Sequence, residues 1–232
     1  MLVVLSRSSL KDNYALWLRR LYPDIELTDA CSADKKSLDN ALQQCSGILL
    51  TGGADVNPAR YGKEKEVSRC DGIDDKRDQV ELDLVETALK RKIPLLAICR
   101  GLQLVNTFFK GSLIIDIPTD YGNRVEHRNK TDVFHAIRVS EDSALSAYGQ
   151  AIHFIVNSSH HQAIKKPGKG LIPVAWSEDG LIEAIEIDPR FTHPFFIGIQ
   201  WHPERMESGH LLSESIGRAF LYSAEQHSSA TF

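Results

Sequence analysis

Cys99, His202 and Glu204 are the residues whose types could do chemistry together. A cysteine nucleophile needs an imidazole that accepts its proton and returns it to the leaving group, and the imidazole needs a carboxylate that fixes its tautomer. Each of the three follows a run of apolar residues that we predict to be a strand. Alone, each has a simpler explanation: a small buried cysteine, a histidine that ends a strand, and a surface acid.

The surroundings of Cys99 favour the catalytic interpretation. The apolar run 93–98 suits a short strand buried on both faces of a parallel sheet. After Cys99, apolar residues recur at helical spacing until Lys110 and Gly111, which are typical of a helix end. A cysteine on a sharp turn between strand and helix is presented like the nucleophile of a nucleophile elbow, beside the positive end of the helix.

Two further segments follow predicted strands at the edge where open α/β sheets keep their sites. Thr51, Gly52 and Gly53 come after strand 47–50, and two glycines let the backbone approach a ligand and direct an N–H at an oxyanion; a plain turn is the alternative. The segment 157–162, NSSHHQ, crowds polar groups together. It could hold a polar substrate, whereas adjacent histidines without an acid at ligand spacing favour a metal less, and we expect no metal. His127 and His135 are scattered in the sequence, and we assign them no role.

Composition excludes several classes of function. The net charge of -4 gives no electrostatic case for nucleic acid or an anionic membrane as the main partner. No apolar run approaches the roughly 20 residues that cross a bilayer. The apolar part of the first ten residues is too short for the hydrophobic region of a secretion signal. The four cysteines form no CxxC pair, so we expect reduced thiols in the cytoplasm.

The pattern predicts a single α/β domain over residues 1–232, a three-layer sandwich with a mostly parallel central sheet and helices on both faces. Residues 6–12 and 54–75 are predicted loops, and the polar tail 227–232 is expected to fray. Strands are predicted at 2–5, 25–27, 47–50, 93–98, 112–117, 133–139, 152–156, 171–177, 181–187 and 195–200. Helices are predicted at 13–22, 32–44, 75–91, directly after Cys99, at 143–148 and at 209–226.

Five motifs together carry a family resemblance: TGGADVNPARYG, DDKRDQVELDLVETALKRKIPLLAICRGLQLVN, VNSSHHQAI, EDGLIEAIE and GIQWHPE. In order and spacing they resemble the class I glutamine amidotransferase superfamily, and within it the peptidase C26-type branch of stand-alone gamma-glutamyl hydrolases typified by gamma-glutamyl-gamma-aminobutyrate hydrolase. The resemblance runs from about residue 47 to residue 204. Lys110, where the family often has glycine, and Ile115, where it often has a polar residue, depart from the pattern.

The resemblance implies a role for each site residue. Cys99 would be the nucleophile, His202 the general base and acid, and Glu204 the orienting carboxylate. The backbone N–H groups of Gly53 and Arg100 would form the oxyanion hole. Substrate contacts would come from three residues: Gln103, Ser159 and His160.

The expected function is hydrolysis of a γ-glutamyl amide through a γ-glutamyl thioester, with release of glutamate and with no cofactor. One alternative is a glutaminase subunit that delivers ammonia to a partner synthetase. Another is a non-catalytic thiol sensor or binding module on the same fold. We expect a small-molecule substrate as the partner; a homodimer is compatible with the sequence, which identifies no interface.

Overall fold

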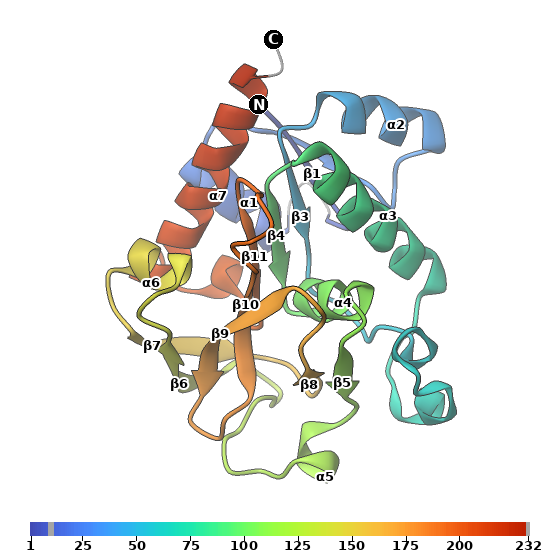
Figure 1. Cartoon of the computed structure of the whole chain (residues 1–232), viewed down its shortest axis with the longest axis vertical. Coiled ribbons are helices and arrows are strands. Elements are labelled where there is room, and N and C mark those ends of the chain that lie inside the picture. The colour runs from blue at the N-terminus through green and yellow to red at the C-terminus, as the bar shows by residue number, and fades with distance from the viewer. Residues whose placement is uncertain (9–11, 231–232) are drawn as a thin grey trace.

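The computed structural model describes residues 1–8 and 12–230, without the side chain of Ala230. Its strands join in one mixed sheet with the order β2-β1-β3-β4-β11-β10-β9-β6-β7, and β8 joins β10 and β5 beside this path (Figure 1). The strands on the β2 side of the sheet run parallel and those beyond β11 pair in antiparallel fashion. The α/β class is therefore confirmed, with a parallel core and an antiparallel extension.

The parallel core consists of five short strands, β1 (Leu2–Leu5), β2 (Glu26–Asp29), β3 (Gly47–Leu50), β4 (Leu95–Ile98) and β11 (Phe196–Ile199). The last three are buried along their whole length, which explains their continuous apolar sequences. Because β3, β4 and β11 are neighbours and parallel, the loops that follow them meet at one edge of the sheet.

The antiparallel extension begins at β10 (Ile182–Ile187), which pairs with β11 on one side and with β9 (Leu171–Ser177) on the other. Beyond β9 lie β6 (Val133–Val139) and β7 (His153–Ser158). The short strands β5 (Ser112–Ile114) and β8 (Ala163–Lys166) pair with each other. The extension is joined to the parallel core through the pairing of β10 with β11.

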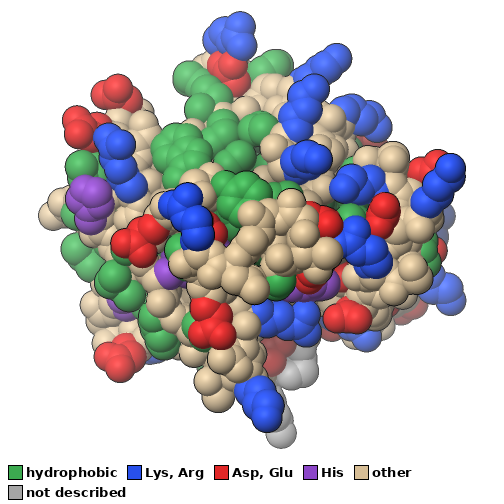
Figure 2. All heavy atoms as spheres, turned by 90° about the horizontal axis from the view of Figure 1, so that it is seen from below, with side chains coloured by type: hydrophobic (Ala, Val, Ile, Leu, Met, Phe, Trp, Pro, Cys, Tyr) green, Lys and Arg blue, Asp and Glu red, His purple; other side chains and the backbone are tan. Residues whose placement is uncertain are grey.

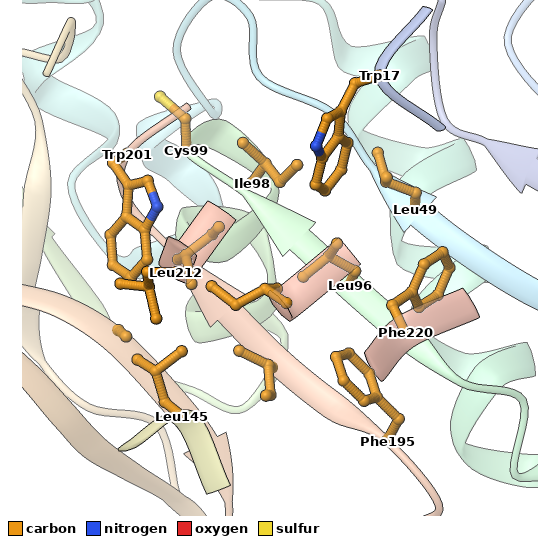
Figure 3. Packing of buried hydrophobic residues seen from close by; sticks show 14 of the residues in the cluster. Trp17, Leu49, Leu96, Ile98, Cys99, Leu145, Phe195, Trp201, Leu212 and Phe220 are labelled. Atoms are coloured by element: carbon orange, nitrogen blue, oxygen red, sulfur yellow. The ribbon is translucent and has the colours of Figure 1, made fainter. Parts of the chain in front are cut away.

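Helices cover both faces of the parallel core. On one face α1 (Asn13–Leu21) and α7 (Leu211–Ala230) place Trp17, Leu212 and Phe220 in a cluster with Leu49, Leu96 and Ile98 (Figure 3). On the other face α2 (Lys35–Gln44), α3 (Asp75–Arg91) and α4 (Arg100–Phe108) pack against the alternate side chains of the same strands. The chain thus forms three layers, as the sequence predicts.

Small helices complete the fold. They are α5 (Ile117–Asp120), α6 (Ala144–Gly149), and the 3₁₀ helices η1 (Pro58–Tyr61), η2 (Glu64–Arg69) and η3 (Pro203–Arg205). The molecular face seen from below carries interspersed acidic and basic side chains (Figure 2). None of the helices within residues 1–8 and 12–230 combines the length and the apolar character needed to cross a bilayer.

Several element boundaries differ from the prediction. The predicted strand 112–117 ends at Ile114, and Ile117 already begins α5 because Asp116 caps that helix. The predicted fraying of residues 227–232 is wrong for 227–230, which continue α7 because neither glycine nor proline ends the helix there. Residues 231–232 and 9–11, part of the predicted loop 6–12, lie outside the described residues.

Candidate active site

Cys99 lies at the joint between β4 and α4 with φ 52° and ψ -104°. A positive φ is strained for a residue with a side chain and is found mostly where function requires it. Cys99 is at the margin of the apolar cluster, and its sulfur points away from that cluster (Figure 3). Arg100 is the first residue of α4, so its N–H has no partner within the helix. The predicted nucleophile elbow is thus formed.

His202 and Glu204 lie directly after β11, the strand next to β4. The Nδ1 atom of His202 is 2.8 Å from Glu204 Oε1, which leaves Nε2 as the nitrogen free to exchange a proton. Burial lowers the pKa of His202, but its interactions with Cys99 and Glu204 outweigh burial and raise the pKa to about 9. The three residues predicted to act together are therefore brought together.

Two side chains that the sequence analysis missed position His202. Asn157, at the end of β7, accepts the His202 N–H at 2.9 Å and donates to the His202 carbonyl at 3.0 Å. Tyr14, on α1, has its hydroxyl 3.4 Å from His202 Nδ1 and accepts the Gly52 N–H at 2.8 Å. Both are distant in sequence from His202; Asn157 belongs to the polar segment 157–162, but no local pattern assigns either residue to His202.

The turn after β3 passes close to Cys99 and His202. A Cβ atom on Gly52 would lie 2.9 Å from the His202 ring and 2.7 Å from the Tyr14 hydroxyl. A Cβ atom on Gly53 would lie 2.2 Å from the Arg77 guanidinium, which donates hydrogen bonds to the Thr51 and Gly52 carbonyls. Only glycine fits at these two positions, as a close approach of backbone to a reacting group requires.

A buried charge network lies beneath this turn. Arg77 pairs with Glu81 at 2.7 Å, and Arg100 pairs with both Glu81 and Asp78. The two acids are on α3: Glu81 is three and four residues before the buried Leu84 and Val85, and Asp78 is three residues before Glu81. Charged residues that continue the apolar side of a helix are the signal that could have revealed the network.

A cavity of about 300 Å³ opens beside Cys99. Gly53 lines it, as do the predicted substrate contacts Gln103, Ser159 and His160. Gln103 is buried and donates to the Gln162 carbonyl at 3.1 Å. His160 presents little polarity to the cavity, because its Nδ1 is 2.9 Å from the Gln162 carbonyl and its Nε2 is directed at Glu183.

Charged side chains of both signs also line this cavity. The Nε2 atom of His161 is 3.0 Å from Asp55, and its Nδ1 atom is 3.3 Å from Asp116. The hydrogen bond that His161 donates to Asp55 raises the pKa of His161, which favours the cation. Arg128 and Asp71 lie 3.6 Å apart and are largely exposed. The cavity therefore suits a small molecule that carries both a positive and a negative charge.

Solved structures with the same fold contain glutaminase-type domains. A GMP synthase component from Thermoplasma acidophilum superposes with a TM-score of 0.67 at 16% identity, covering 100% of this chain and 97% of the other. The glutaminase domain of Trypanosoma brucei CTPS superposes with a TM-score of 0.65 at 14% identity, covering 97% and 94%. The fold is thus that of glutamine amidotransferase-type domains.

Proteins related in sequence identify the family within this fold class. The gamma-glutamyl-gamma-aminobutyrate hydrolase of Escherichia coli O157:H7 is 33% identical over 205 residues, which is 84% of this chain and 78% of the relative. The glutamine amidotransferase-like protein YvdE of Lactococcus lactis is 38% identical over 173 residues, 73% of this chain and 70% of the relative. The sequence model of the Peptidase C26 family matches residues 27–204, and the chain belongs to this family. The family is one of glutamine amidotransferase-like hydrolases that act on amide bonds.

Proposed function

We propose that the protein hydrolyses a γ-glutamyl amide through a thioester on Cys99. One observation carries this proposal: Cys99 and the His202–Glu204 pair lie together beside a cavity that has charges of both signs. Cys99 is held there at a positive φ. A hydrogen-bonded imidazole and carboxylate next to a thiol are the groups that nucleophilic acyl transfer needs.

In the first half of the reaction the Cys99 thiolate attacks the side-chain carbonyl carbon of the substrate. The N–H groups of Gly53 and Arg100 stabilise the resulting oxyanion. The imidazolium of His202 gives its proton to the leaving amine, the C–N bond breaks, and the acyl group stays on sulfur as a thioester. Glu204 keeps the imidazole ring oriented through Nδ1.

In the second half water replaces the amine. Neutral His202 accepts a proton from water as the water oxygen attacks the thioester carbon, and the C–S bond breaks to release glutamate. The thiolate and the imidazolium of the resting site are then restored. Dividing the reaction into two acyl transfers lowers the barrier of each.

The cavity supports a γ-glutamyl group over other acyl groups. Such a group carries an α-carboxylate and an α-ammonium at the end remote from the amide. Arg128 would bind the carboxylate and Asp71 the ammonium. The His161 imidazolium, whose two nitrogens already bind aspartates, would contribute positive charge only. Arg128 and Asp71 were not predicted from the sequence, His161 belongs to the segment 157–162 expected to hold a polar substrate, and Ser159 stays a predicted contact beside them.

Release of the amine, or of ammonia from glutamine, from a panel of amides tests the proposal. The panel contains γ-glutamyl-γ-aminobutyrate, other γ-glutamyl amides, free glutamine, and glutaryl amides that lack the ammonium group. We expect turnover of γ-glutamyl amides, loss of it by a factor on the order of 10³ or more in Cys99→Ala, and weak turnover of the glutaryl amides. Cys45→Ala is the matched control, because it removes a buried thiol far from the cavity.

Each other outcome has a definite meaning. If glutamine alone is turned over, and faster with a synthetase present, the protein is a glutaminase subunit instead. If the folded protein turns over no amide and its Cys99 oxidises reversibly, it is a thiol sensor. Equal turnover of γ-glutamyl and glutaryl amides would refute the assignment of Asp71 while leaving the hydrolase in place.

A further inference from the structure

Four buried side chains outside the proposed triad converge on one point: His127, His135, His160 and Glu183. They come from the loop before β6, from β6, from the loop after β7 and from β10. Each offers one ligand atom, and these atoms lie within 4.8 Å of one another. All four residues are at most 6% exposed. The cluster is therefore closed to solvent.

The outward-facing nitrogen of each imidazole is bound to an acceptor. His127 Nε2 is 3.1 Å from an Asp179 oxygen, His135 Nδ1 is 3.2 Å from the Ala136 carbonyl, and His160 Nδ1 is 2.9 Å from the Gln162 carbonyl. A carboxylate or carbonyl only accepts, so each of these nitrogens carries the hydrogen of a neutral imidazole. The remaining nitrogen of each ring then presents a lone pair.

These lone pairs face each other and a carboxylate. His127 Nδ1, His135 Nε2, His160 Nε2 and both Glu183 oxygens have no hydrogen-bond partner among the described residues. The three nitrogens lie 3.8, 3.7 and 3.6 Å from Glu183 Oε1, beyond the length of a hydrogen bond. Acceptors without a hydrogen between them, in a site closed to water, repel one another unless a cation lies at their centre.

We propose that these four side chains bind one divalent transition-metal ion, most suitably Zn²⁺, as a structural site. Ligands about 2.0–2.1 Å from zinc in a tetrahedron are about 3.4 Å apart, close to the separations observed here. Imidazole and carboxylate together suit zinc and its neighbours, whereas Mg²⁺ and Ca²⁺ take oxygen ligands. Four protein ligands leave no open position, which is the mark of a structural zinc site.

The hydrogen bonds around the cluster fit the same role. Metal-bound histidines commonly donate their second N–H to a carboxylate or carbonyl, which fixes the ring. Asp179 does this for His127 and itself accepts from the Ser177 hydroxyl at 2.6 Å. His160 also lines the cavity beside Cys99, so the ion would fix the wall formed by residues 159–162. This inference replaces the sequence-based expectation of no metal.

Metal content of the purified protein tests the site. The protein is produced with zinc in the medium, freed of any affinity tag, dialysed, and measured by mass spectrometry for metals. We expect about one zinc per chain in the wild type and in Cys99→Ala, because the proposed ligands do not include the thiol. Glu183→Gln and His135→Ala should lose the zinc, whereas His153→Ala, an exposed histidine on β7, should keep it.

Zinc-edge X-ray absorption gives a second readout that is independent of activity. We expect three nitrogens and one oxygen at about 2.0–2.1 Å and no sulfur near 2.3 Å. In Asp179→Ala the zinc affinity should fall about 10-fold to 100-fold, as loss of a group that orients a ligand does.

Three results would overturn the proposal. The first is a folded wild-type protein that holds no zinc and takes up none on dialysis against Zn²⁺. The second is retention of zinc by folded Glu183→Gln and His135→Ala. The third is a sulfur ligand in the first coordination shell of the zinc. After the first result, a protonated Glu183 in place of a metal ion would explain the cluster, because burial raises the pKa of this carboxyl to about 7. None of these measurements depends on turnover, so their failure is distinct from failure of the hydrolase.

Discussion

The imidazole of His202 lies between a thiol and a carboxylate, and these two neighbours decide its charge. Burial alone would make the ring neutral, yet its pKa is raised to about 9 because Cys99 and Glu204 both favour the cation. At neutral pH the resting site therefore holds an imidazolium that can protonate a leaving amine.

Replacing the thiol should lower the pKa of His202. In Cys99→Ala the attraction of the thiolate is gone while burial and Glu204 remain, so the pKa falls below the wild-type value of about 9. NMR titration of the His202 ring measures this. Cys45→Ala should leave the titration unchanged, and an unchanged pKa in Cys99→Ala would mean that the two side chains do not interact.

Among single residues, the sequence predicted the members of the proposed triad but not the side chains that position His202. Cys99 and His202 could be found because each follows a recognisable strand in a known motif. Tyr14 and Asn157 could not, because their importance arises only from the tertiary contacts that bring α1 and β7 to His202. The grouping of His160, predicted as a substrate contact, with the other cluster residues was missed for the same reason, since His127 and Glu183 are separated by many residues and meet only in the folded chain.

Among the elements, α4 is the one whose position matters most for Cys99. Its second residue, Gly101, lies so close to β3 that a Cβ atom there would be 2.6 Å from the Leu50 carbonyl oxygen and 2.7 Å from Leu50 Cβ. The backbone of a buried strand cannot yield as a flexible side chain can. The helix carries Cys99 and Arg100 at its beginning, so a displaced α4 would displace the nucleophile.

Gly101→Ala should destabilise the protein. Helix propensity alone predicts stabilisation by about 1 kcal/mol, because alanine is the better helix former. Overpacking against Leu50 opposes this and costs about 1–3 kcal/mol or more, and we expect a net loss of about 2 kcal/mol. Urea denaturation measures the sign, and a variant more stable than the wild type would contradict the close packing of α4 on β3.

The sequence predicted most strands in both parts of the sheet, and two strands of the extension, β6 and β9, have the predicted bounds. Strands β1 and β3 and helix α3 have the predicted bounds, because buried runs and capping aspartates mark them clearly. Strand β8 was not predicted: it has four residues, two buried and two exposed, and its pairing partners β5 and β10 are distant in sequence. Such a strand is specified by its neighbours and not by its own pattern.

For the whole molecule, aspartates at helix N-termini link stability to pH. Asp34, Asp74 and Asp116 each accept a backbone N–H from the first turn of a helix. This hydrogen bond is the main cause that lowers the pKa of Asp34 and Asp74 below the ordinary 3.8, whereas for Asp116 the Thr119 hydroxyl is the main cause. A lowered pKa means stability that is present above pH 3.8 and is lost as the pH falls through the folded-state value.

Asp74→Asn should weaken this dependence. Asparagine still caps a helix but has no charge to lose, so the fall in the urea midpoint between pH 6 and pH 3 becomes smaller than in the wild type. Asp24→Asn, at an exposed aspartate that caps no helix, is the control and should follow the wild type. Equal slopes for Asp74→Asn and the wild type would contradict the role of this cap.

The position of β11 in the sheet has a consequence for the newly made chain. β11 lies between β4 and β10 in the sheet but leaves the ribosome after both, long after Cys99 at the end of β4. Until β11 arrives, β4 is an open edge with unpaired backbone groups, which invites pairing with another chain. The thiol also lacks His202 and Glu204 during that time. The same segment therefore closes the gap between β4 and β10 and brings His202 and Glu204 to Cys99, so the proposed triad cannot form in a chain that has not yet reached β11.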